Sequence, residues 1–165
     1  MKQFEKAQRY LERIRRIYAG IPFDENTKKD YEDDVYSFFI NCHHIRDWII
    51  SLNKVGIKAS DVEAFIDNNQ ALQVCADLCD GAKHCKRNRP PRSNWQPNVA
   101  LKMYSETIYN TDLDRKSVAK ARYTVISAYG QWDVLDLGET CMKLWSEYVE
   151  SMRKRAEKQG LDSRV

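Results

Sequence analysis

Two groups of histidine and aspartate residues carry the ionisable side chains most suited to chemistry. His43 and Asp47 are four residues apart, whereas Asp77, Asp80 and His84 are separated by three and four residues. On helices, these spacings place each group on one face. If the two faces met, their imidazoles and carboxylates could bind Zn, Mn or Fe, or act as an acid–base pair. The alternative is that both groups are structural. Asp80 and His84 would then form a pair on a helix surface, and His43 and Asp47 a partly buried polar contact without a metal.

The candidate catalytic residues are therefore His43, Asp47, Asp80 and His84, and the same residues with Asp77 are candidate metal ligands. The sequence contains no nucleophile elbow, Walker loop or dinucleotide-binding glycine motif. We expect no cofactor, with a divalent metal at the His/Asp groups as the alternative.

A basic stretch at residues 83–92 is the densest cluster of positive charge in the chain. It contains no acidic residue, and a tryptophan follows it. Such a segment could bind phosphate by charge and stack a nucleic-acid base. Basic clusters also occur on solvated helix ends, where they complement the helix dipole. The candidate binding residues are Lys83, Lys86, Arg87, Arg89, Arg92 and Trp95.

The five cysteines indicate free thiols in a reducing cytoplasm, because their number is odd and the N-terminus has no apolar signal segment. Cys75, Cys79 and Cys85 lie close together in the sequence, which raises the possibility of zinc. Zinc sites usually combine two closely spaced pairs of ligands, and only one cluster is present here. We therefore expect Cys75 and Cys79 to fill a helical core as small apolar residues. Cys85, beside a histidine and a lysine, is the best candidate for a reactive thiol.

The spacing of apolar residues predicts four helical segments before a proline-rich break at 89–93: residues 2–19, about 27–52, 60–68 and 71–86. The second segment is apolar on several sides, which is typical of a central helix with several neighbours. Ser60 and Glu63 have the spacing of a capping box for the short third segment. Gly20-Ile21-Pro22 is expected to end the first helix.

The pattern then changes to one typical of strands. Residues 99–108 and 118–128 are rich in Tyr, Thr, Val and Ile, with a polar and exposed connection between them and a turn at 129–131. We expect one domain over residues 1–165, with helices in 2–88, a β region at 99–133 and a C-terminal helix at 134–158. The predicted fold is mainly α (α+β). It is a bundle of about four long helices with a small antiparallel hairpin or meander before the last helix.

Composition supports a single soluble domain. The 165 residues are 42% hydrophobic and 31% charged, with a net charge of +3 that says little about partners. The apolar runs are too short to span a membrane. The small net charge hides an acidic start to the second helix and basic patches on the first helix, the 83–92 stretch and the C-terminus.

Two motifs resemble a family of small helical bacterial and phage proteins that has no transferable function. They are the aromatic-rich segment 38–48 with its His-x3-Asp-Trp pattern, and the segment 75–84 with its Asp-Gly-x-Lys-His pattern. The helical arrangement is distantly similar to the HEPN superfamily, many members of which are RNases of toxin–antitoxin and phage-defence systems. Those enzymes carry an Arg-x4–6-His motif that this sequence lacks, so the resemblance implies a non-catalytic relative.

We therefore expect a cytoplasmic, non-catalytic binding or accessory protein that contacts a protein partner or RNA, with no membrane association. A role in a phage or defence system is what the resemblance implies. The alternative is a metal-dependent or acid–base hydrolase of a nuclease-like kind that uses the His/Asp groups. A homo-oligomer is a third possibility.

Overall fold

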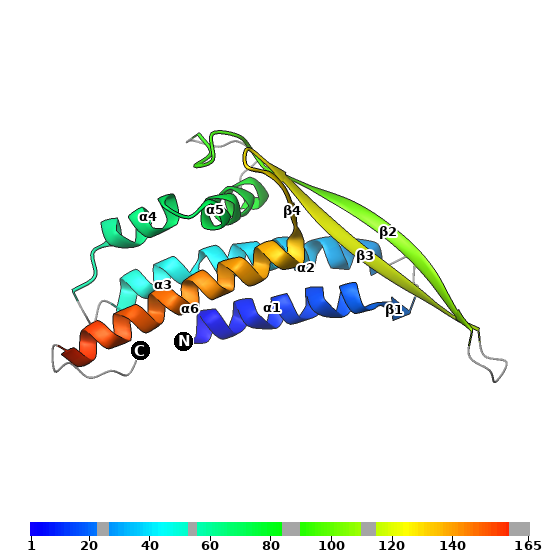
Figure 1. Cartoon of the computed structure of the whole chain (residues 1–165), viewed down its shortest axis with the longest axis horizontal. Helices are drawn as coiled ribbons and strands as arrows, with labels where there is room; N and C mark the ends of the chain where they lie inside the picture. Colours follow the sequence, from blue (N-terminus) through cyan, green and yellow to red (C-terminus); the bar gives the residue numbers. More distant parts are fainter. Residues whose placement is uncertain (23–26, 53–55, 84–89, 110–114, 159–165) are drawn as a thin grey trace.

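The computed structural model describes residues 1–22, 27–52, 56–83, 90–109 and 115–158. Within these ranges it describes the backbone but not the side chains of residues 21–22, 27–30, 83, 101–109 and 115–120. The architecture is mainly helical, with an antiparallel sheet before the C-terminal helix (Figure 1). The fold class predicted from the sequence is confirmed. The helices are α1 Lys2–Ala19, α2 Thr27–His43, α3 Ile45–Leu52, α4 Ala59–Asp67, α5 Gln70–Lys83 and α6 Val134–Lys158. The strands are β1 Ile21–Pro22, β2 Asn98–Tyr109, β3 Arg115–Ser127 and β4 Gly130–Asp133.

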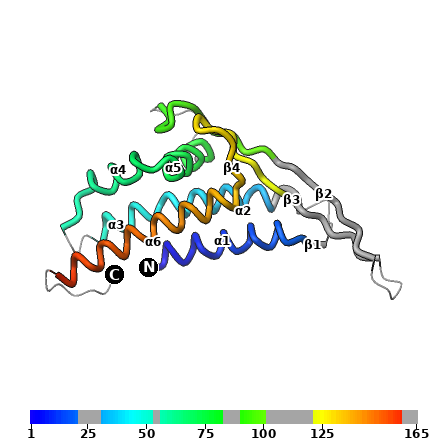
Figure 2. Tube along the Cα trace, viewed as in Figure 1, coloured from blue at the N-terminus to red at the C-terminus, as the bar shows by residue number. Residues whose placement is uncertain are grey.

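The core lies between α2 and the helices around it. The long helices α1, α2 and α6 run alongside one another, and α2 also packs against α5 (Figures 1 and 2). The predicted central position of α2 is confirmed. The apolar stripe of α1 faces this core through Ala7, Leu11 and Ile14, which are at most 1% exposed. Phe38 of α2 is fully buried, with its ring edge-on to that of Phe39.

A glycine allows α6 to approach this core closely. A Cβ atom on Gly138 would lie 2.9 Å from Leu11 Cδ1 and 3.0 Å from Phe38 Cε1. These distances are too short for ordinary van der Waals contact, so a larger residue would force the Leu11 and Phe38 side chains to move. Glycine therefore allows the close approach of α6 to α1 and α2.

The predicted helix over 27–52 is interrupted at His44, and this part of the prediction is wrong. α2 ends at His43 and α3 begins at Ile45. The Asp47 amide donates to the His44 carbonyl at 3.2 Å, a bond spanning three residues that tightens the chain into a turn. The Asp47 carboxylate also bonds to the His44 ring. The apolar spacing continues through the turn, so hydrophobic periodicity did not predict the break.

The N-terminus of α4 also differs from the prediction. The residue that caps the helix is Lys58, and the carboxylate of Asp61 accepts the Lys58 amide at 3.3 Å. The capping box predicted for Ser60 and Glu63 is therefore shifted by two residues. Glu63 is engaged instead in ion pairs with two arginines.

The sheet is built on a long two-stranded ribbon. β2 and β3 pair in antiparallel register from Asn98 opposite Ile126 to Tyr109 opposite Arg115. A strand of this length spans about 40 Å. On its other side, β3 pairs with β1 through Ala119 and Val118 and with β4 from Thr124 to Ser127. The two main strands were predicted within a few residues, whereas β1 was expected only as a helix end.

Contacts from α1 and α6 hold the base of this ribbon. The Tyr18 hydroxyl accepts the Tyr123 amide and donates to the Tyr123 carbonyl, both at 3.1 Å. Ala121, Tyr123 and Val125 are at most 3% exposed, and the intervening Arg122 is exposed. The alternation shows that one face of β3 covers the bundle. Farther along, at residues 107–109 and 115–117, pairing in the described chain is between β2 and β3 alone.

Candidate functional site

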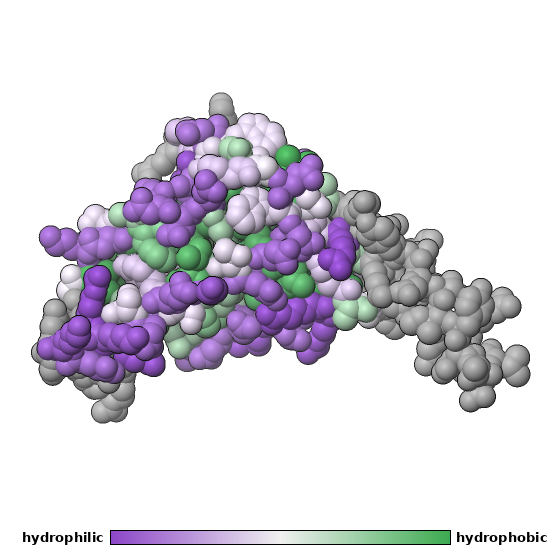
Figure 3. All heavy atoms as spheres, in the orientation of Figure 1, coloured by the Kyte–Doolittle hydropathy of each residue, from purple (hydrophilic) through white to green (hydrophobic). Residues whose placement is uncertain are grey.

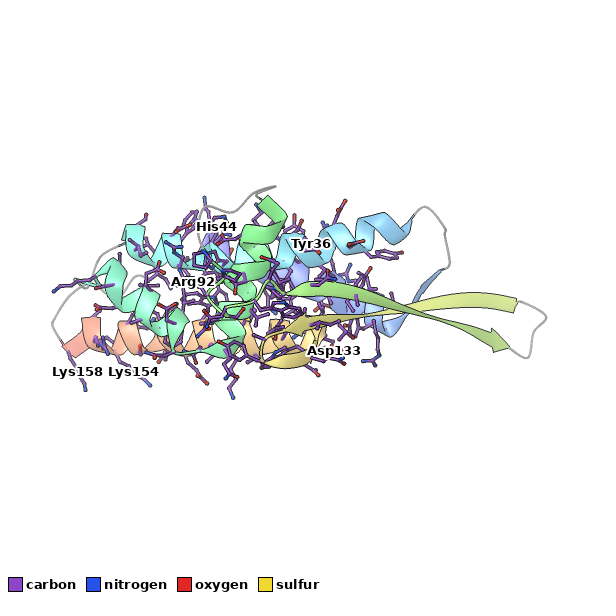
Figure 4. The ribbon with its side chains drawn as sticks, turned by 90° about the horizontal axis from the view of Figure 1, so that it is seen from above. Tyr36, His44, Arg92, Asp133, Lys154 and Lys158 are labelled. Atoms are coloured by element: carbon purple, nitrogen blue, oxygen red, sulfur yellow. The ribbon has the colours of Figure 1, made fainter. Side chains whose placement is uncertain are left out.

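The structure places Asp47 beside His44 rather than His43. The Asp47 carboxylate lies 2.6 Å from His44 Nδ1 at the exposed turn between α2 and α3 (Figure 4). His43 is only 6% exposed, and its Nε2 lies 3.4 Å from the Arg46 guanidinium. Burial, followed by the positive charges of Arg46 and Arg92, lowers the pKa of His43 to about 3. His43 is therefore neutral at pH 7 and accepts a hydrogen bond within the protein.

Asp77 anchors the segment that follows the basic stretch. Its carboxylate is 1% exposed and accepts the Arg92 amide at 2.8 Å, the Ser93 amide at 2.9 Å and the Ser93 hydroxyl at 2.7 Å. Gln96 adds a hydrogen bond to the Asp77 carbonyl at 3.3 Å. Asp80 is half-buried on the same helix, and His84 lies outside the described residues. In the described chain, none of these predicted histidines or aspartates belongs to a group of three potential metal ligands.

Arg92 fastens the same segment to α4. Its guanidinium contacts Glu63 and lies 2.6 Å from Asp67, and Arg46 lies 2.8 Å from Glu63. The charge of Arg92 is thus balanced within the protein, although the sequence suggested a ligand-binding role. Trp95, three residues farther on, is 48% exposed. Of the other predicted binding residues, Lys83 ends α5, and Lys86, Arg87 and Arg89 lie outside the described residues.

Both ends of the basic stretch lie next to the base of the ribbon. The stretch begins at the end of α5 and returns to Asp77 of that helix through Arg92 and Ser93. β2 begins at Asn98. The turn between β3 and β4 reaches the same helix, because the Tyr129 hydroxyl bonds to Gln73.

The ribbon carries an excess of basic residues that sequence inspection overlooked, because the segment was considered only for its strand propensity. The segments that form β2 and β3 contain one acidic residue, Glu106, and five basic residues: Lys102, Arg115, Lys116, Lys120 and Arg122. The register places Lys102 opposite Arg122. Arg122 lies 3.6 Å from Asp133, and its guanidinium lies 5.1 Å from the centre of the Tyr18 ring. We call these five residues, with the strands that carry them, the basic ribbon.

Three cysteines from three helices meet inside the bundle. The sulfur atoms of Cys42 in α2, Cys75 in α5 and Cys141 in α6 all lie within 4.8 Å of one another. Each residue is at most 1% exposed. We call this group the thiol cluster. The sequence did not reveal it, because its members are far apart in the chain and only the packing of the three helices brings them together.

The prediction that Cys75 and Cys79 lie in the core is confirmed, because both are 1% exposed. Cys79 is not part of the thiol cluster. Cys85, the predicted reactive thiol, lies outside the described residues.

Comparison with known proteins yields no match among family models, curated proteins or solved structures. No family relationship is shown by these comparisons, and the resemblance to HEPN-like proteins stays a prediction. In the described part of the chain, no helix combines the length and apolar character needed to cross a membrane.

Proposed function

We propose that this protein is a non-catalytic nucleic-acid-binding protein whose basic ribbon contacts the phosphodiester backbone. The observation that carries the proposal is the excess of basic over acidic residues in the two strands of a long antiparallel ribbon. Phosphate contacts from Lys and Arg supply most of the sequence-independent affinity for nucleic acids. A two-stranded ribbon also has dimensions that fit the major groove of duplex DNA.

The register of the ribbon adds an electrostatic argument. Lys102 and Arg122 occupy directly opposed positions. Like charges at such positions destabilise a sheet. The Arg122–Asp133 pair is long at 3.6 Å, and the Arg122 side chain is 58% exposed. A bound phosphate would offset the repulsion between the two strands.

The basic stretch supports the same surface. Its two ends are fixed near the base of the ribbon by α5 and by the Asp77 hydrogen bonds. Lys86, Arg87 and Arg89 come from this stretch, and the exposed Trp95 follows it. Charge and an exposed aromatic ring are the combination that binds single-stranded nucleic acid.

The cationic end of α6 offers a weaker surface. Figure 3 shows hydrophilic residues over the C-terminal part of α6, but positive and negative charges are mixed there. Glu150 lies 3.8 Å from Arg153 and 3.7 Å from Lys154, and Glu147 lies 4.0 Å from Lys143. This internal pairing favours the basic ribbon as the nucleic-acid surface.

The arrangement of the predicted catalytic residues favours binding over hydrolysis. His43 is neutral and buried, and the Asp77 carboxylate holds the backbone of Arg92 and Ser93. Asp47 pairs with His44. A wider role as an accessory factor in a phage or defence system is supported by the sequence resemblance alone.

Charge reversal on the ribbon tests the proposal. We would compare Lys116→Glu/Lys120→Glu with the matched control Lys143→Glu/Lys154→Glu, which changes the net charge equally on α6. Fluorescence anisotropy would measure binding to single-stranded RNA, double-stranded RNA and duplex DNA of one sequence. We expect the ribbon variant to bind at least about tenfold more weakly than the control. Circular dichroism would confirm that both variants fold.

A second variant, Lys86→Glu/Arg87→Glu/Arg89→Glu, tests the basic stretch in the same assay and should also weaken binding. The three ligands show whether RNA or DNA is the preferred source of the phosphodiester backbone. Equal affinity of the ribbon variant and the control would overturn the proposal, as would no binding of any ligand at low salt. A partner captured after nuclease treatment, with no affinity for nucleic acid, would favour a protein-binding role instead.

A further inference from the structure

The thiol cluster brings three sulfur donors together inside the helical bundle. Cys42, Cys75 and Cys141 come from three different helices, yet their sulfur atoms all lie within 4.8 Å of one another. Cys75 Sγ lies 3.6 Å from the Phe39 carbonyl, and Cys141 Sγ lies 3.4 Å from the Ala71 carbonyl. Thiolates bound to one metal ion at a metal–sulfur distance of about 2.3 Å have separations below this limit. The spacing of the three sulfur atoms is therefore compatible with their converging on a single ion.

An indole N–H group supplies a second, independent observation. Trp145, on α6 one turn after Cys141, is 1% exposed, and its Nε1 atom has no hydrogen-bond partner among the described residues. A buried donor of this kind destabilises the fold when it is left unpaired. Burial raises the pKa of the Cys42 thiol well above its usual range. Residues four apart lie on the same face of a helix, so Trp145 lies beside Cys141 on α6, and its unpaired N–H is a donor close to the cluster.

The three sulfur atoms also influence one another. Burial works to raise the pKa of Cys141, but hydrogen bonds from Cys42 and Cys75 outweigh this effect and lower it. Burial raises the pKa of Cys75 well above its usual range.

From these contacts we infer that Cys42, Cys75 and Cys141 form a binding site for a soft, thiophilic metal cation, with Cu⁺ as the expected occupant. Thiolate ligands select Cu⁺, Zn²⁺ and iron–sulfur clusters. Structural Zn²⁺ almost always takes four ligands, and the cluster offers three within the described chain. Cu⁺ accepts three sulfur ligands in a plane. Each bond between the ion and a sulfur replaces an S–H bond and releases one proton to solvent. The ion offsets part of the negative charge that this creates, and the Trp145 N–H is a hydrogen-bond donor for a thiolate sulfur.

This inference is independent of the proposed nucleic-acid function, because the thiol cluster lies in the helical bundle and the basic ribbon lies in the sheet. The experiment uses the full chain, reduced and freed of metal with a chelator under anaerobic conditions. Cu⁺ would be added both to the folded protein and during refolding from denaturant, so that slow entry into the closed cluster is not mistaken for absence of a site. After desalting, the metal content and the X-ray absorption spectrum would be measured.

We expect one equivalent of Cu⁺ per chain with three sulfur atoms in its first shell, and a higher melting temperature for the loaded protein. The variants Cys42→Ala, Cys75→Ala and Cys141→Ala should each lose this binding. Cys79→Ala is the matched control, because Cys79 is equally buried on α5 but lies outside the cluster. Circular dichroism of each metal-free variant would show that loss of binding is not loss of folding.

Three results would overturn the inference. They are the absence of bound Cu⁺ by either route, binding of Zn²⁺ in preference to Cu⁺, and Cu⁺ binding that the Cys79→Ala variant loses as readily as the cluster variants. The third result would show that thiols elsewhere in the chain hold the ion.

Discussion

The helical bundle and the basic ribbon are built on opposite principles. In the bundle, apolar side chains of α1, α2, α5 and α6 are almost completely buried, and the thiol cluster and His43 are enclosed as well. The two strands of the ribbon carry five basic residues against one acidic residue, and among the described residues part of the ribbon is paired by these two strands alone. Packing therefore accounts for the stability of the bundle, whereas the charge of the ribbon contributes little to folding. We expect substitutions to separate the two regions cleanly.

The largest effect is expected in the core. Phe38→Ala removes a fully buried ring that contacts Phe39 and lies against Gly138. It should lower the free energy of unfolding by about 3–5 kcal/mol. Urea denaturation would measure the loss, with Lys116→Glu/Lys120→Glu as the comparison, expected to change stability by no more than about 0.5 kcal/mol. A ribbon variant as unstable as the core variant would show that the two regions are not separable.

A slightly smaller effect is expected where the bundle meets the segment that leads into the ribbon. Asp77→Ala removes a buried carboxylate that accepts three hydrogen bonds and leaves the Arg92 and Ser93 amides without that acceptor. The loss should be about 3 kcal/mol. Asp80→Ala is the control on the same helix, where the side chain is only half-buried. If chemical denaturation showed the same loss of stability for both variants, Asp77 would not anchor the Arg92–Ser93 segment to α5.

His43 should make the bundle sensitive to pH. Its pKa is about 3 in the folded protein, because of burial and of Arg46, Arg92 and His44, with Asp47 acting in the opposite direction. An unfolded histidine has a pKa of about 6.5, so the unfolded chain takes up the proton first as the pH falls. Stability is therefore lost from about pH 6.5 downward, and amounts to about 2 kcal/mol between pH 7 and pH 5.

The variant His43→Gln isolates this contribution, because it keeps a hydrogen-bond acceptor that does not titrate. Denaturation of both proteins at pH 7 and pH 5 would show a smaller decrease for the variant. An identical pH dependence in the two proteins would show that folding does not lower the pKa of His43.

The smallest effect is expected at the surface of the bundle. Arg15 and Glu139 join α1 to α6 at 3.0 Å, and both side chains are more than one third exposed. Exposed ion pairs contribute only about 0–1 kcal/mol. Glu139→Ala should thus shift the denaturation midpoint by an amount near the limit of detection, in contrast to Phe38→Ala. A loss comparable with that of the core variant would contradict the assignment of stability to apolar packing.

The difference between the two regions also explains what the sequence could predict. The bundle helices and the strands β2 and β3 follow from local patterns, the spacing of apolar residues and the enrichment in Tyr, Thr, Val and Ile. The break at His44 does not follow from them, because the apolar spacing is continuous there. The turn is marked instead by the contact between the Asp47 carboxylate and the His44 ring.

The candidate sites depend on contacts between distant residues. Cys42, Cys75 and Cys141 meet only after three helices pack, and no spacing in the sequence relates them. The role of Arg92, which follows α5, depends on Glu63 and Asp67 of α4. Its charge was therefore assigned to a ligand when the sequence was considered alone.

The salt dependence of nucleic-acid binding tests the central claim most directly. Removing two phosphate contacts reduces the slope of log K against log salt concentration by about 2. We predict this decrease for Lys116→Ala/Lys120→Ala and no decrease for Lys143→Ala/Lys154→Ala, with equal denaturation midpoints for both. An unchanged slope in the ribbon variant would contradict the assignment of nucleic-acid binding to the basic ribbon.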